Sequence, residues 1–117
     1  MMDTFDFIDK AVTQGIKRAV VDAASSGDNT IVAAVTGKKI RVHSCVIIMT
    51  GTAVTLRFES GAGGTALTGQ MQPSQGGGFV LPHNPMGWFE TAAGELLNLE
   101  LGDAQSADGV LVYSEVG

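Results

Sequence analysis

The sequence predicts an all-β fold: a β-sandwich, jelly-roll-like, with eight or nine short antiparallel strands and a short N-terminal arm. Residues 53–59 alternate between apolar and polar side chains, the pattern of a strand with one buried face. Clusters rich in Gly, Pro, Asn and Asp recur roughly every 8–12 residues, which is typical of sandwiches and barrels. Helices do not alternate with strands, and this excludes a nucleotide-binding α/β fold. Eight strands after a first arm suit a jelly roll.

Residues 1–16 differ in pattern from the rest of the chain. Apolar residues recur there at steps of three and four: Phe5, Ile8, Val12 and Ile16. This spacing fits an amphipathic helix, but a helix of this length is marginal in water. The segment is therefore either an arm that becomes ordered on a partner or a short helix packed on its own domain. The predicted domains are an arm at 1–16 and a β-sandwich at 17–117.

Nine strands are expected in the sandwich, each bounded by turn signals. Their residue ranges are 17–24, 30–36, 39–49, 53–59, 65–71, 79–81, 88–91, 95–101 and 109–116. Tight turns at 37–38 and 51–52 join three of these strands, so residues 30–59 are expected to pair consecutively as a β-meander.

The strand at 39–49 carries apolar residues on both expected faces. Strict alternation places one set on one side: Ile40, Val42, Val46 and Ile48. It places a mixed set on the other: Arg41, His43, Cys45, Ile47 and Met49. A strand that buries most of both faces needs a second sheet, a neighbouring subunit, or both.

The composition points to a surface that is partly covered by a partner. Charged residues make up 16% of the chain, against roughly 25% in an ordinary domain, and the mean hydropathy is +0.22. A net charge of −5 argues against wrapping nucleic acid, which requires a basic surface. The single cysteine permits a reducing cytoplasm. Acidic residues near the N-terminus and the lack of a long apolar run predict neither a signal peptide nor a membrane span.

Few residues form patterns that carry chemistry, and we predict no catalytic, cofactor-binding or metal site. His43 and Cys45, two apart on one expected strand, could supply two metal ligands with His83 as a third, but ordinary packing is the favoured interpretation. Glu90, Glu95 and Glu100 lie on strands expected to be neighbours, and a glycosidase-like pair is less favoured than solvated strand faces.

Trp88 and Phe89 are adjacent in an expected strand and should therefore face opposite ways. One can fill the core while the other meets solvent or a partner. We predict a core residue beside an interface residue.

Three stretches of the sequence carry a family resemblance. They are SSGDNTIVAAVTGKKIRV (Ser25–Val42), LPHNPMGWFETAAGELLNLEL (Leu81–Leu101) and GVLVYSEV (Gly109–Val116). The chain resembles small virion structural proteins encoded by tailed bacteriophages and prophages. The resemblance implies a β-sandwich or jelly-roll protein of the capsid surface, made in the host cytoplasm. It also implies a decoration (cement) protein that works as a homotrimer, with itself and the major capsid protein as partners.

The residues predicted to bind these partners are Phe5, Phe7, Ile8 and Trp88. Two other functions stay open. The chain is alternatively a tail, collar or head-fibre component of the virion. The second alternative is a carbohydrate-binding module that uses Trp88 and the loops around Gly61 and Gly76.

Overall fold

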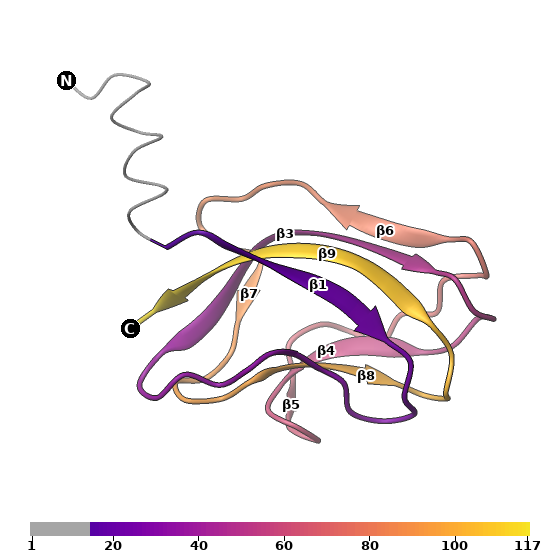
Figure 1. Cartoon of the computed structure of the whole chain (residues 1–117), viewed down its shortest axis with the longest axis horizontal. Helices are drawn as coiled ribbons and strands as arrows, with labels where there is room; N and C mark the ends of the chain where they lie inside the picture. The colour runs from indigo at the N-terminus through magenta and orange to yellow at the C-terminus, as the bar shows by residue number, and fades with distance from the viewer. Residues whose placement is uncertain (1–14) are drawn as a thin grey trace.

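The computed structural model describes residues 15–117, which form nine strands in two antiparallel sheets (Figure 1). The predicted all-β sandwich is confirmed, whereas jelly-roll connectivity stays a prediction. The strands are β1 (Lys17–Ala23), β2 (Thr30–Val32), β3 (Lys39–Met49), β4 (Leu56–Ser60), β5 (Thr65–Ala66), β6 (Gly78–Leu81), β7 (Phe89–Glu90), β8 (Leu97–Leu101) and β9 (Ala107–Val116). Within residues 15–117, no helix is long and apolar enough to cross a membrane. Phe5, Phe7 and Ile8 lie outside the described residues.

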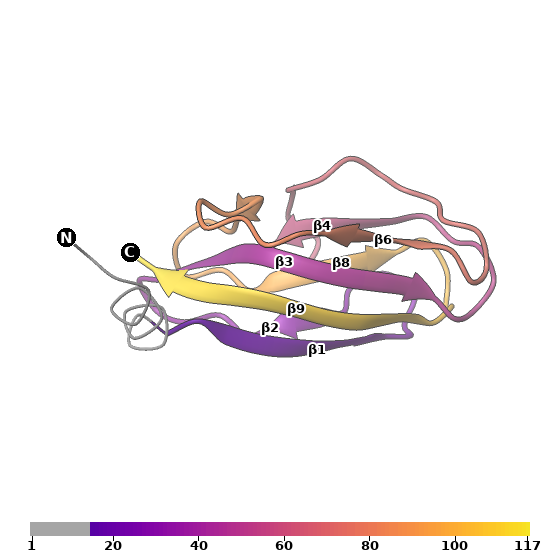
Figure 2. The same cartoon turned by 90° about the horizontal axis from the view of Figure 1, so that it is seen from above.

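One sheet, called sheet A, has the strand order β1-β9-β3-β6, with β7 also paired to β3. The other, sheet B, has the order β2-β8-β4-β5. The two longest strands, β3 and β9, pair from Lys39 opposite Val116 to Met49 opposite Ala107. Figure 2 shows β1, β9 and β3 running side by side. Sheet A therefore has a central strand pair with shorter strands at its edges.

The predicted meander is wrong, because β3 belongs to sheet A while β2 and β4 belong to sheet B. A turn closes where the Lys38 N–H donates to the Val35 carbonyl at 3.0 Å, and Gly37 has a φ of 74° there. Positive φ suits glycine. This turn carries the chain from one sheet to the other instead of folding it back on its neighbour.

A β-bulge at His43 changes which side chains of β3 face the core. Val42 pairs with Tyr113 and Ser44 pairs with Val112, so His43 is an extra residue in the ladder. An extra residue reverses the alternation beyond it. Ile40 and Val42 before the bulge, and Cys45, Ile47 and Met49 after it, are all buried. The prediction that Val46 and Ile48 share the face of Ile40 and Val42 is therefore wrong.

The core lies between the two sheets. Phe58 of β4 is fully buried and packs on Phe89 of β7, with ring centroids 5.1 Å apart. Leucines of β8 and the inward residues of β3 surround this pair. Sheet B thus covers the inner face of sheet A, whereas Val20 of β1 and Val80 of β6 are exposed on its outer face.

Candidate functional site

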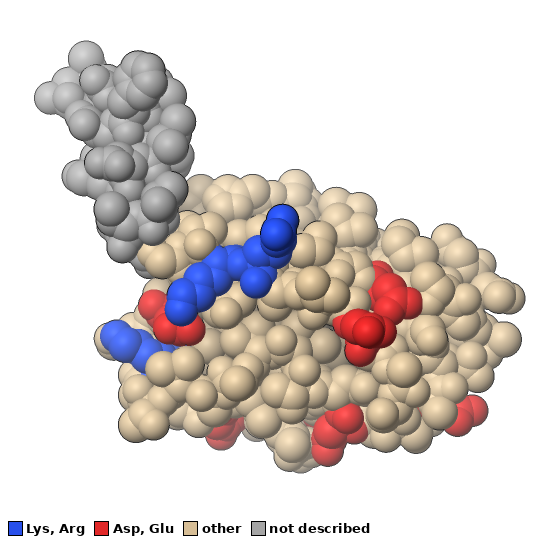
Figure 3. All heavy atoms as spheres, viewed as in Figure 1, with Lys and Arg blue, Asp and Glu red and all other residues tan. Residues whose placement is uncertain are grey.

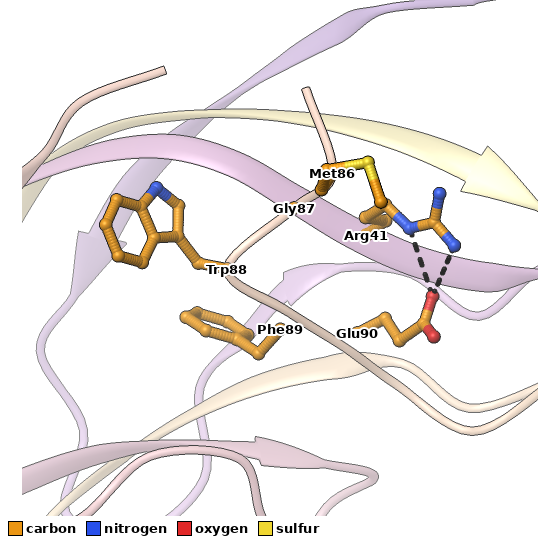
Figure 4. Close-up of a pocket in the computed structure, with 6 residues that line it drawn as sticks. All are labelled: Arg41, Met86, Gly87, Trp88, Phe89 and Glu90. Carbon is orange, nitrogen blue, oxygen red and sulfur yellow. Dashed lines mark hydrogen bonds and ion pairs between the residues drawn. The ribbon is translucent and has the colours of Figure 1, made fainter. Parts of the chain in front are cut away.

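Trp88 lies beside an open hollow of about 230 Å³ on sheet A (Figure 4). The Trp88 backbone N–H donates to the Val42 carbonyl, and its indole Nε1–H donates to the Pro82 carbonyl, both at 2.8 Å. Gly87 has a φ of 85°, and a Cβ there would lie 2.5 Å from Cγ of Arg41. Only glycine allows this close approach. The two hydrogen bonds therefore hold the indole in place, and in Figure 4 its ring points away from Arg41.

The hollow also contains an ion pair. Nε and Nη2 of Arg41 each lie 3.1 Å from Oε2 of Glu90. Phe89 packs on Phe58 of the core, whereas Trp88 remains 44% exposed. The prediction that these adjacent aromatics face opposite ways is confirmed. The hollow is thus lined by an indole, which can offer a stacking surface, and by a separate ion pair with hydrogen-bonding groups.

The glycine loops expected to join Trp88 in a carbohydrate site lie elsewhere. The Gly76 N–H donates to Met49, at the opposite end of β3 from Val42. Seven residues of strand separate those two positions, roughly 23 Å. The Gly61 N–H donates to the Leu96 carbonyl next to sheet B. Trp88 therefore shares its hollow with neither loop, and that part of the carbohydrate prediction is wrong.

The outer face of sheet A carries a row of four valines, one from each strand. Val20 pairs with Val110, Val110 with Val46, and Val46 with Val80. We call this set the valine row. Val20 is 74% exposed and Val80 is 63% exposed. A contiguous apolar strip across a sheet is typical of an interaction surface.

Charged residues of opposite sign flank the valine row on β1. Arg18 pairs with Val112 on one side of the row, and Asp22 pairs with Asp108 on the other. Figure 3 shows a stripe of basic side chains with acidic atoms beside it at one end, and a separate acidic group further along the same view. Within residues 15–117, Arg18 and Asp22 take part in no ion pair. The face is thus apolar along the valine row, with a positive charge on one side of the row and negative charges on the other.

His43 uses both ring nitrogens in hydrogen bonds rather than facing Cys45. Nδ1 lies 2.9 Å from the Asn84 carbonyl, and Nε2 lies 2.8 Å from the Ser114 hydroxyl. An Nδ1–H that donates to Asn84 leaves Nε2 to accept from Ser114. The ring also stacks on His83, with centroids 5.7 Å apart. Both His43 and Ser114 are buried, so this pair fastens the bulge to β9 and to the loop after β6.

Cys45 faces the core, and its pKa is about 11 because burial disfavours the thiolate, although a hydrogen bond with Leu81 opposes the shift. A thiol, unlike a thiolate, is a poor nucleophile and a poor metal ligand. The bulge turns the Cys45 side chain towards the core. The His43 side chain instead bonds to Ser114, which lies on the outer face of sheet A. The two residues therefore do not form the ligand pair that their spacing allows.

A network of carboxylates lies over sheet B and was not predicted. Glu59 is fully buried; its Oε2 accepts from Nε of Arg57 at 2.8 Å and its Oε1 accepts from Nδ2 of Asn98 at 2.9 Å. Asn98 also donates to Asp28 at 2.8 Å. Carboxylate oxygens of Asp28, Glu59 and Glu100 all lie within 4.8 Å of one another. Such oxygens suit Ca²⁺, but Arg57 and Asn98 already occupy those of Glu59, so the network serves the fold.

Glu59 and Glu100 have pKa values shifted in opposite directions. Burial raises the pKa of Glu59, but hydrogen bonds from Glu100, Arg57 and Asn98, with the Arg57 charge, outweigh it and hold the pKa below its ordinary value. The hydrogen bond to Glu59 raises the pKa of Glu100, and burial and the Glu59 charge act in the same direction. A hydrogen bond between the two carboxyls requires one of them to hold a proton, and the directions of the two pKa shifts favour that proton on Glu100. The pair prefers to hold one proton.

We expect Glu100→Gln to raise the free energy of unfolding at pH 7 by up to about 1 kcal/mol. A raised carboxyl pKa adds stability that is complete below the unfolded-state pKa, about 4.3, and is lost as the pH rises through the folded-state pKa. The Gln amide can donate a hydrogen bond at all pH values, whereas the Glu100 carboxyl can do so only when protonated. The stability difference between the variant and wild type should therefore vanish towards pH 4. Urea unfolding at pH 4, 5.5 and 7 measures the difference.

The matched variant Glu59→Gln should act in the opposite sense. The lowered pKa of Glu59 means that its stability is present above the unfolded-state pKa and is lost as the pH falls through the folded-state pKa. At pH 7 we expect a loss of about 1–3 kcal/mol, because a Gln amide opposite Arg57 leaves buried donors unpaired. A Glu100→Gln variant less stable than wild type at pH 7 would contradict this account of the pair.

The three glutamates predicted as possible neighbours lie apart. Glu90 belongs to sheet A with Arg41, Glu95 accepts from the Ser60 hydroxyl, and Glu100 lies beside Arg57. The actual cluster joins Glu100 to Glu59, because Arg57 pairs with Glu100 and Glu59 with Asn98. Alternating polar positions on the two strands were visible in the sequence. Their pairing and register were not.

Comparison of the chain with protein-family models, curated proteins and solved structures gives no match. The fold and its surfaces by themselves define the protein as an all-β sandwich. One face of its sheet A carries an apolar row with opposite charges on its two sides.

Proposed function

We propose that the protein is a non-enzymatic structural component of a tailed-bacteriophage particle, a capsid decoration protein that stabilises the shell as a homo-oligomer. The observation that carries the proposal is the exposed valine row with its flanking charges. A surface of that kind serves assembly. The resemblance of three stretches to small virion proteins supports the choice of particle. It implies a trimer, with the major capsid protein as the second partner.

The proposed mechanism is stabilisation by mass action. A protein that binds the assembled shell and not its separated subunits shifts the equilibrium towards the shell. Phe5, Phe7 and Ile8 are proposed to supply apolar anchors to a capsid subunit, with Trp88 as a further contact. β1 begins at Lys17 and is an edge strand of sheet A. The anchors therefore precede the first strand of the sandwich in the sequence.

Removing residues 1–16 is expected to abolish binding to particles while leaving the sandwich folded. The full chain and the form 17–117 should be compared by co-sedimentation with decoration-free particles of the phage or prophage that encodes the chain. Bound copies per particle are the readout, and far-UV circular dichroism controls for folding. Equal occupancy of the two forms would refute the role of the anchors.

Two other functions are separated by simple observations. Labelling the protein on intact particles distinguishes a capsid position from a tail, collar or head-fibre position. The hollow lined by Trp88 and by the Arg41–Glu90 ion pair favours carbohydrate binding as the second candidate. A glycan array on wild type and Trp88→Ala tests it, because loss of the stacking ring should remove sugar binding.

A further inference from the structure

We infer that the outer face of sheet A binds the same face of a second copy of this chain, about a twofold axis that runs along the valine row. The inference specifies the self-association on which the proposed function rests. The twist of each sheet is compatible with such packing, because stacked sheets commonly cross at about 30°.

The register of sheet A makes the face self-complementary. An axis along the row exchanges the two ends of every strand and keeps each strand opposite its own copy. Each valine of the row then meets the same valine of the second copy. Arg18 and Asp22 lie two residues to either side of Val20 on β1. The same rotation therefore places Arg18 of one copy against Asp22 of the other, twice per pair.

Two aspartates lie together on one side of the valine row, and no ion pair within residues 15–117 involves either of them. Asp22 and Asp108 are directly opposite each other on β1 and β9, and like charges in that arrangement repel. Thr50 donates to Asp108, which leaves both negative charges in place. Arg18 is exposed and belongs to the same face. Pairing of two copies brings that guanidinium to the two aspartates.

The size of the face sets the expected strength of the pairing. Four strands about 4.8 Å apart, each contributing about five residues, give a flat area of roughly 300 Å². Stable interfaces bury about 800 Å² per partner. Because the face is less than half of that size, we expect a weak, reversible dimer whose population depends on protein concentration. An isologous contact closes at two copies, so it predicts a dimer where the resemblance implies a trimer.

The experiment is sedimentation equilibrium of the full chain and of two charge-reversal variants, Arg18→Asp and Asp22→Arg, at low salt. Wild type should dimerise, and each variant alone should weaken the dimer by about tenfold or more, because both symmetric contacts become repulsive. An equimolar mixture of the variants should recover wild-type affinity. In the mixed pair the introduced aspartate of one variant faces the introduced arginine of the other, and the retained Arg18 faces the retained Asp22. Lys38→Asp makes the same charge change at the turn before β3 and should leave the dimer intact.

Recovery on mixing separates a broken interface from a broken fold, because an unfolded variant would not be rescued. A wild type that is monomeric at all concentrations, a trimer insensitive to both variants, or a mixture that stays monomeric would each overturn the inference. Binding to particles by a monomeric wild type would overturn the pairing and leave only the particle-binding part of the proposed function, and a dimer that binds no particle would leave only the pairing.

Discussion

Replacing Gly109 by alanine is expected to lower the free energy of unfolding by about 3 kcal/mol or more. Gly109 lies in β9 between Val21 and Ile47 on the inward side of sheet A. A Cβ at this position would lie 1.7 Å from the Val46 carbonyl oxygen. That atom is backbone of the neighbouring central strand, so relief requires β3 and β9 to separate. Urea unfolding monitored by Trp88 fluorescence measures the loss.

Gly69→Ala is the matched control for this prediction. Nothing lies within 4 Å of a Cβ built at Gly69, and its φ is outside the range that favours glycine. Alanine there restricts the unfolded chain without strain in the folded one, so stability should change by no more than about 0.5–1 kcal/mol, towards greater stability. Equal midpoints for the two variants would show that the strand approach at Gly109 does not limit stability.

Replacing Phe58 by alanine is expected to cost about 3–5 kcal/mol. The ring is fully buried between the sheets and packs on Phe89. Its removal leaves a cavity at the contact between β4 of sheet B and β7 of sheet A. Because β7 is only two residues long, we expect Trp88 and the Arg41–Glu90 ion pair to lose order together with it.

Phe58→Leu is the control for cavity size, since it keeps most of the apolar volume and should cost about 1.5 kcal/mol or less. Urea midpoints at one pH compare both variants with wild type. Far-UV circular dichroism shows whether the sheets persist, and indole fluorescence shows whether Trp88 keeps its ordered environment. A cost for Phe58→Ala no larger than that for Phe58→Leu would mean that this aromatic contact is not central to the packing of the two sheets.

The bulge at His43 connects stability to the proposed assembly surface. It turns Cys45, Ile47 and Met49 inward and leaves Val46 on the outer face of sheet A, in line with Val20, Val110 and Val80. The hydrogen bond that His43 donates to Asn84 and the one that it accepts from Ser114 fix the position of the extra residue. Without it, strict alternation along β3 would direct Val46 into the core and break the valine row.

Local patterns in the sequence were enough to predict the class of the fold. Alternation in the segment around Leu56 and Phe58 and the recurrent turn residues predicted short strands in two layers. The adjacency of Trp88 and Phe89 predicted one core residue beside one exposed residue. These features are local, because side-chain direction along a strand depends on a two-residue period. The low charge and the two-sided apolar strand at 39–49 also indicated a surface in need of a partner.

Which strands pair, and in what register, became visible only in three dimensions. The turn at Gly37 moves the chain between sheets, the bulge at His43 reverses the facing of half of β3, and cross-strand register brings Glu59 to Glu100. The alternation of apolar and polar residues predicts none of these three features, because each depends on hydrogen bonds between segments far apart in the chain. The valine row and its opposite charges are likewise assembled from several strands. The surface that carries the proposed function is therefore a product of register rather than of any single segment.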